Sequence, residues 1–177
     1  VETAGVPIHH LDLGGGLGIR YTDEEPPGAD ALIAQLLARI EARGHGHREV
    51  IFEPGRSLVG NAGVLVTEVL YLKPGAQRNF CIVDGAMNDL MRPAMYEAYM
   101  ATAACRLRDE APVRYDVVGP VCESGDWLAR DRDLAVRQGD RLAILSAGAY
   151  GMSMASNYNT RGRPAEVMIA DGQAHLI

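Results

Sequence analysis

The sequence predicts a two-part α/β plus β protein, with the tail of an α/β barrel over residues 1–60 and a mostly antiparallel β-domain over residues 61–177. Two observations predict this division. Strand and helix patterns alternate in the first part, and glycine-containing loops follow its strands. After Gly63, strand-like segments follow one another between turns, and little helical periodicity remains.

The first part reads as strand, loop, helix and strand. An apolar run over residues 8–13 predicts a buried strand that ends on the glycines Gly14–Gly16. A second short strand is predicted over residues 50–52, directly before Glu53–Arg56. Parallel α/β folds place their sites in loops at the carboxyl ends of strands, so both loops are candidates for chemistry.

A helix is predicted between these strands. Apolar residues recur at three- and four-residue spacing over residues 32–40, which is the stripe of an amphipathic helix. Asp30 is the expected N-cap and Gly44 the expected C-terminal stop.

In the second part, strand patterns cover residues 64–72, 79–84, 113–118 and 140–146. Asp171-Gly172 lies between two further strand patterns, residues 166–169 and 175–177, and predicts a tight hairpin. Residues 87–104 are ambiguous, because their Ala and Met content favours a helix whose start Pro93 restricts.

Composition excludes several classes of protein. With 47% hydrophobic residues, 23% charged residues and a net charge of -6, the chain is typical of soluble globular proteins. The chain contains no run of about 18 apolar residues, so no membrane-spanning helix is predicted. The net negative charge argues against nucleic-acid binding. Three cysteines without CxxC spacing argue against a disulfide scaffold or zinc ribbon and favour a cytoplasmic location. The histidines show no metal-ligand spacing, so no metal site is predicted.

Two loops of the first part are suited to anions. Consecutive glycines, as in Gly14–Gly18, let backbone N–H groups approach an anion. This loop lacks both the P-loop lysine and the GxGxxG spacing. The alternative interpretation is a plain tight turn. In Glu53–Arg56, the guanidinium suits an anionic oxygen and the carboxylate could hold a ring nitrogen protonated. Alone, this loop would be read as a surface turn with a salt bridge.

Three groups of the second part are further candidates. Cys122 lies on a polar loop beside Glu123, where a thiol could donate a proton, although a lone cysteine is more often a small buried residue. Arg92 and Tyr96 are four residues apart, so a helical turn would place both on one face to hold a carboxylate, with solvated surface as the alternative. Tyr150 lies between small residues and could offer its hydroxyl to an anion.

Six sequence motifs occur in order over nearly the whole chain: His10–Gly18, Glu53–Arg56, Asp84–Pro93, Gly119–Asp126, Gly148–Gly151 and Ser156–Pro164. Together they resemble the second half of the fold-type III pyridoxal-phosphate (PLP) decarboxylases, most closely the diaminopimelate decarboxylases, which have ornithine and arginine decarboxylase relatives. The resemblance implies a PLP-binding (β/α)8 TIM barrel followed by a β-domain similar to the C-terminal domain of alanine racemase.

The resemblance also implies roles for the first-part loops. The cofactor-binding residues would be Gly15, Gly16, and the four residues Glu53, Pro54, Gly55 and Arg56, together with Tyr150 of the second part. Glu53 would face the pyridine nitrogen of the cofactor.

For the substrate, the resemblance implies that Arg56, Arg92 and Tyr96 hold a distal carboxylate, that Tyr150 contacts both cofactor and substrate, and that Glu123 accepts a distal ammonium. Cys122 would be the catalytic acid. In the family, Cys122 and Glu123 would come from the neighbouring subunit, which implies a homodimer with a shared active site. The implied reaction is decarboxylation of meso-diaminopimelate to L-lysine and CO2, the last step of lysine biosynthesis.

One feature of the family has no counterpart among these residues. The family's Schiff-base lysine lies upstream of the six matching motifs. Lys73 follows Glu53–Arg56, so Lys73 is not assigned that role. We therefore expect a fragment that is inactive alone. The alternatives are a decarboxylase of another amino acid, of the ornithine, lysine or siderophore-pathway type, and a non-catalytic module that retains the fold and dimer face.

Overall fold

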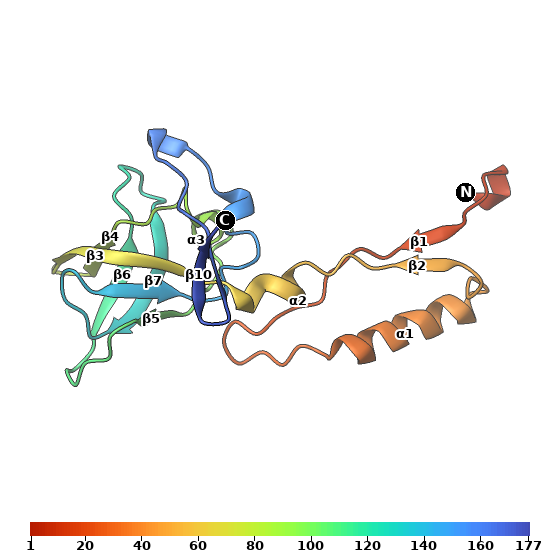
Figure 1. The fold of residues 1–177 in the computed structure, drawn as a ribbon, viewed down its shortest axis with the longest axis horizontal. Coiled ribbons are helices and arrows are strands. Elements are labelled where there is room, and N and C mark those ends of the chain that lie inside the picture. Colours follow the sequence, from red (N-terminus) through yellow and green to blue (C-terminus); the bar gives the residue numbers. More distant parts are fainter. The chain divides into compact units, whose positions relative to one another are not determined.

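The computed structural model describes all residues 1–177, which form two compact units, residues 1–59 and residues 60–177 (Figure 1). The two units are described separately below. In neither unit does a helix combine the length and the hydropathy that crossing a membrane requires.

Unit 1 is a βαβ element with short helices at its two ends. Its elements are η1 Glu2–Ala4, β1 His10–Asp12, α1 Ala29–Ala42, β2 Glu49–Ile51 and α2 Arg56–Val59. Strands β1 and β2 pair in parallel, and α1 makes the crossover between them. The predicted order of strand, loop, helix and strand is confirmed.

The two ends of α1 differ in how well the sequence predicts them. The helix stops as expected at Gly44, whose φ of 81° is left-handed. The Gly44 N–H donates to the Glu41 carbonyl at 2.8 Å, and the His45 N–H donates to the Ile40 carbonyl at 3.1 Å. The predicted N-cap is wrong. Gly28 caps the helix in an extended conformation, and Asp30 lies inside the first turn without a capping hydrogen bond. There its charge still interacts favourably with the helix dipole.

Unit 1 buries little apolar surface. Ile19 is its one buried hydrophobic side chain, and none of the residues of α1 is buried. The apolar stripe of α1 is thus only partly covered within the unit, although such a stripe normally faces a core.

Unit 2 is built on a six-stranded sheet in the order β5-β8-β3-β4-β6-β7. Its strands are β3 Leu65–Lys73, β4 Asn79–Val83, β5 Thr102–Ala104, β6 Val113–Val118, β7 Trp127–Leu134 and β8 Arg141–Ile144. Only β4 and β6 pair in parallel, and the other neighbours are antiparallel. Because the edge strands β5 and β7 approach each other, the mixed sheet is a nearly closed barrel.

Short helices and one hairpin complete unit 2. The helices are η2 Gly60–Ala62, α3 Met91–Tyr96, η3 Met152–Met154 and η4 Tyr158–Thr160. The hairpin joins β9 Val167–Ala170 to β10 Gln173–Leu176. Its turn residues Asp171 and Gly172 have φ values of 50° and 73°, which confirms the predicted hairpin.

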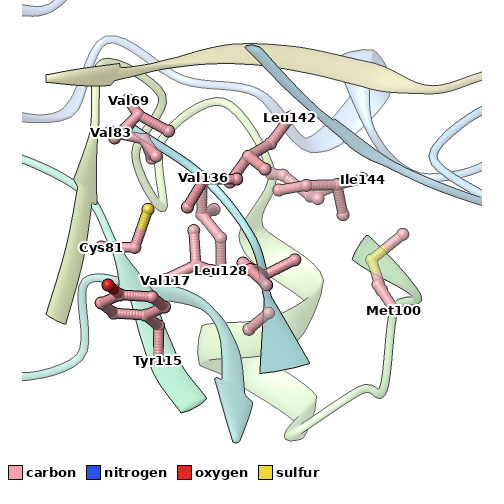
Figure 2. Close-up of a cluster of buried hydrophobic side chains, with 13 residues drawn as sticks. Val69, Cys81, Val83, Met100, Tyr115, Val117, Leu128, Val136, Leu142 and Ile144 are labelled. Carbon is pink, nitrogen blue, oxygen red and sulfur yellow. The ribbon is translucent and has the colours of Figure 1, made fainter. Parts of the chain in front are cut away.

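The core of unit 2 lies inside the curled sheet (Figure 2). Val69, Val83, Val117, Leu142 and Ile144, all fully buried, come from the four strands β3, β4, β6 and β8. Cys81 lies among them, and burial raises the pKa of its thiol to about 12, so this cysteine is a core residue.

Strand β7 is the main element that the sequence pattern misses. Its charged run, Arg130 to Asp133, hides the alternation of a strand, since Asp131 occupies an irregular position with φ 56°. The register between β6 and β7 shifts there, and the Asp131 N–H donates to the Asp116 carboxylate at 2.9 Å. A β-bulge held by a buried carboxylate therefore replaces regular pairing.

Candidate active site

In unit 1, the glycine loop and the Glu53–Arg56 loop lie side by side. The pairing of β1 and β2 continues beyond the strands: Leu13 N–H donates to the Ile51 carbonyl at 3.0 Å, and Glu53 N–H donates to the Gly14 carbonyl at 2.8 Å. A Cβ on Gly15 would lie 2.5 Å from the Glu53 carbonyl oxygen. Only glycine permits this approach, so Gly15 is what lets the two predicted loops meet.

The other two glycines leave space beside this junction. Gly14 and Gly16 have φ values of 65° and 92°, and a Cβ on either would meet nothing within 4 Å. The Asp12 carboxylate accepts the Gly14 N–H at 2.7 Å. An anion at the loop would thus depend on the amides of Gly15 and Gly16.

In unit 2, a buried carboxylate joins two of the predicted segments. Asp126, 3% exposed, accepts the Met87 N–H at Oδ1 and the Val121 N–H at Oδ2, both at 2.7 Å. Burial raises the pKa of this carboxyl, against the lowering effect of the two backbone hydrogen bonds. Asp126 thereby fixes the loop that carries Cys122 to the segment that begins at Asp84.

A guanidinium joins a third segment to the same place. Arg161 donates from Nε to the Asn88 side-chain oxygen at 2.9 Å and from Nη2 to the Asp84 carbonyl at 2.6 Å. The same Nη2 lies 3.6 Å from the buried Asp89 carboxylate. The Ser156 N–H adds a bond of 2.9 Å to the Asn88 carbonyl. Segments 84–93, 119–126 and 156–164 thus form one hydrogen-bonded assembly.

Arg92 and Tyr150 are neighbours, with the guanidinium carbon 5.8 Å from the ring centroid. Arg92 and Tyr96 both lie in α3, four residues apart, so the helical turn that the sequence left open is present. Tyr150 has a left-handed φ of 60°, a conformation that non-glycine residues keep only where their surroundings impose it. Here the preceding loop is fixed, since the Ala147 N–H donates to the Gly63 carbonyl at 2.9 Å and the Gly148 N–H donates to the Gly60 carbonyl of η2 at 3.1 Å.

Cys122 and Glu123 are exposed on their loop. The hydroxyl of Tyr158 donates to the Glu123 carboxylate at 2.9 Å. That hydrogen bond is the main cause of a raised pKa of Tyr158, to which the nearby Cys122 thiol also contributes. The sequence analysis did not identify Tyr158, Asp126 and Arg161 as candidate site residues, although all three lie in the six sequence motifs.

The match to a family model covers residues 19–148 and is described as "pyridoxal-dependent decarboxylase, C-terminal sheet domain". The chain belongs to this family. Relatives include the diaminopimelate decarboxylases of Pseudomonas aeruginosa, 58% identical over 98% of this chain and 41% of the relative, and of Vibrio cholerae, 50% identical over 100% of this chain and 42% of the relative.

Solved structures of diaminopimelate decarboxylases also match this chain. The Helicobacter pylori diaminopimelate decarboxylase complexed with L-lysine matches with a TM-score of 0.87 and 38% identity, over 99% of this chain and 43% of that one. The M. jannaschii enzyme in co-complex with L-lysine has a TM-score of 0.87 and 42% identity, over 99% and 41%. The chain therefore spans about two fifths of the length of the relatives that it matches.

A pyridoxal-dependent decarboxylase has to hold a phosphate ester, and the residues of unit 1 fit this requirement. The open space beside Gly14 and Gly16 leaves room for an anion at the loop. Arg56, at the start of α2 and half-buried, provides a fixed positive charge in the adjoining loop. The donor set of backbone amides and a guanidinium is the one that phosphate prefers.

Proposed function

We propose that the chain is part of a PLP-dependent diaminopimelate decarboxylase, which converts meso-diaminopimelate to L-lysine and CO2 in the last step of lysine biosynthesis. The observation that carries this proposal is the 58% identity with a diaminopimelate decarboxylase over 98% of this chain. The H. pylori relative complexed with L-lysine supports an amino-acid ligand of this class. The enzyme would act in the cytoplasm.

In this proposal, residues 1–60 are the C-terminal part of the PLP-binding barrel, and residues 61–177 are the β-rich domain that carries the substrate and proton-donor loops. Parallel pairing of β1 and β2 across α1 is the repeating unit of such a barrel. The unburied stripe of α1 supports the same assignment, because barrel helices are covered by neighbouring units.

The cofactor phosphate would be held by Gly15 and Gly16 and by the loop from Glu53 through Pro54 and Gly55 to Arg56. When bound, PLP supplies an electron sink for the carbon that loses CO2. Glu53 would accept a hydrogen bond from the protonated pyridine nitrogen and so stabilise the positive charge of the ring. Tyr150 would contact cofactor and substrate.

The substrate carries an amino-acid group at each end, so its distal end needs an anion site and a cation site. Arg56, Arg92 and Tyr96 would bind the distal carboxylate, and Glu123 the distal ammonium. The closeness of Arg92 to Tyr150 supports a common site for these residues.

Cys122 would deliver the thiol proton to the carbon that has lost CO2. Its exposure on a loop beside Glu123 is compatible with contact to a substrate, unlike the buried Cys81. We further propose a homodimer in which Cys122 and Glu123 of one subunit complete the site of the other.

Substrate comparison tests this function. The complete, PLP-loaded enzyme that contains these residues is expected to release CO2 from meso-diaminopimelate much faster than from ornithine or lysine, because only the first fills both distal sites. Preference for ornithine or lysine would indicate a decarboxylase of another amino acid. Absence of turnover on all three would favour a non-catalytic module.

A further inference from the structure

Tyr158 connects two segments that lie far apart in the sequence. Its hydroxyl donates to Glu123 Oε2 at 2.9 Å. Glu123 is exposed, so without this bond its side chain would sample several rotamers in solvent. The bond instead selects one position for the carboxylate, next to Cys122.

Tyr158 can select that position only because its own segment is fixed. Arg161, three residues later, bonds to Asn88 and to the Asp84 carbonyl, and the Asn157 side chain donates to the Arg161 carbonyl at 2.9 Å. The turn that carries Tyr158 is therefore attached at its base to the segment that begins at Asp84.

The backbone of Glu123 is fixed from the other side. Asp126 donates its N–H to the Glu123 carbonyl at 3.0 Å, and its carboxylate accepts the Val121 N–H. Backbone and side chain of Glu123 thus have separate supports, Asp126 for the former and Tyr158 for the latter.

We propose that Tyr158 is a positioning residue, which holds the Glu123 carboxylate in place beside the Cys122 thiol. There the carboxylate receives the distal ammonium of the substrate, which is the α-ammonium when L-lysine is bound. This inference rests on the proposed function for the identity of the ligand. A carboxylate oxygen that accepts one hydroxyl hydrogen still has acceptor capacity, as has its second oxygen, so the bond to Tyr158 leaves room for an ammonium.

Ligand binding tests the proposal without turnover. In the complete PLP-loaded enzyme, Tyr158→Phe should weaken L-lysine binding about fivefold in calorimetric titration, since one hydrogen bond is lost. Binding of 6-aminohexanoate, which has the carboxylate and the terminal amine but no α-ammonium, should not change. Tyr71→Phe, at an exposed tyrosine of β3, is the matched control and should leave both affinities unchanged.

A double variant completes the test. In a Glu123→Ala background, Tyr158→Phe should cause no further loss of lysine affinity, because the group that it positions is gone. The effects of the two single substitutions on the free energy of unfolding should not add up in the double variant, because the two side chains share one hydrogen bond. Equal weakening of both ligands, or wild-type lysine affinity, would overturn the role of Tyr158.

The two proposals fail differently. If the wild-type enzyme neither decarboxylates diaminopimelate nor distinguishes lysine from 6-aminohexanoate, the proposed function is wrong. The support of Glu123 by Tyr158 is then judged by the free energies of unfolding alone, and additive effects of the two substitutions overturn it.

Discussion

Three cysteines of one chain have different surroundings and therefore different chemistry. Cys81 is enclosed by the core, which raises the pKa of its thiol to about 12 and makes it unreactive. Cys105 and Cys122 are exposed. Of these two, Cys122 lies in the loop that Asp126 attaches to the segment beginning at Asp84, which leads into α3 with Arg92 and Tyr96.

Replacement of Cys122 should separate catalysis from cofactor binding. In the complete enzyme, Cys122→Ala is expected to lower turnover of meso-diaminopimelate by about 10²–10⁴-fold, the usual contribution of a positioned acid. The PLP absorbance spectrum should stay the same. Cys105→Ala is the matched control and should keep wild-type turnover. Loss of bound PLP in Cys122→Ala would instead indicate a structural role.

Gly15 is expected to be essential for a steric reason. A Cβ at this position would lie 2.5 Å from the Glu53 carbonyl oxygen, so Gly15→Ala has to push the two loops apart at a cost of about 1–3 kcal/mol. PLP affinity, measured by absorbance titration of the complete enzyme, should fall. Gly18→Ala is the control, because its Cβ would meet only the Pro26 side chain at 3.8 Å. Equal affinities of the two variants would contradict this account.

At the scale of elements, local patterns predicted what depends on local contacts. The glycine stop of α1 and the Asp171-Gly172 hairpin each follow from the φ preferences of one or two residues. By contrast, Arg161 meets Asn88 across 73 positions of sequence. Hydrophobic periodicity carries no information about a contact between residues so far apart in the sequence. The hydrogen bonds that hold the candidate site together could therefore not be predicted.

The start of β8 carries a charge pair that should make stability depend on pH. Arg108 donates to both carboxylate oxygens of Asp140 at 2.9 and 2.6 Å, and this pairing lowers the pKa of Asp140 to about 2. The unfolded value is about 3.9. A lowered pKa stabilises the fold above about pH 4, and the contribution is lost as the pH falls towards 2.

Asp140→Asn should therefore lower the free energy of unfolding by about 2 kcal/mol at pH 7, and the difference from the wild type should shrink between about pH 4 and pH 2. Urea denaturation at several pH values measures this. Asp133→Asn removes a pair that is 55% exposed on the carboxylate side and should change stability by less than about 1 kcal/mol. A difference that stays constant with pH would show that Asp140 acts by packing alone.

At the scale of the whole molecule, the proposed function assigns different roles to the two units. Unit 1 would supply the phosphate-binding loops, and unit 2 the substrate and proton-donor groups. The fold of each unit could be predicted in outline from strand and helix patterns, apart from the bulged strand β7 and the short strand β5, which lies in the ambiguous stretch 87–104. The proposed assembly of the site from two chains rests on the family resemblance alone, because no pattern within one chain encodes a symmetric partner.

Subunit complementation tests this shared site most directly. Complete enzymes with Cys122→Ala and with Arg56→Ala should each be almost inactive on meso-diaminopimelate. After the two are mixed, dissociated and reassembled, half of the dimers would be heterodimers with one intact site each, so activity should recover to about a quarter of the wild-type level. No recovery, with heterodimers demonstrated in the mixture, would contradict a site in which Cys122 of one subunit serves Arg56 of the other.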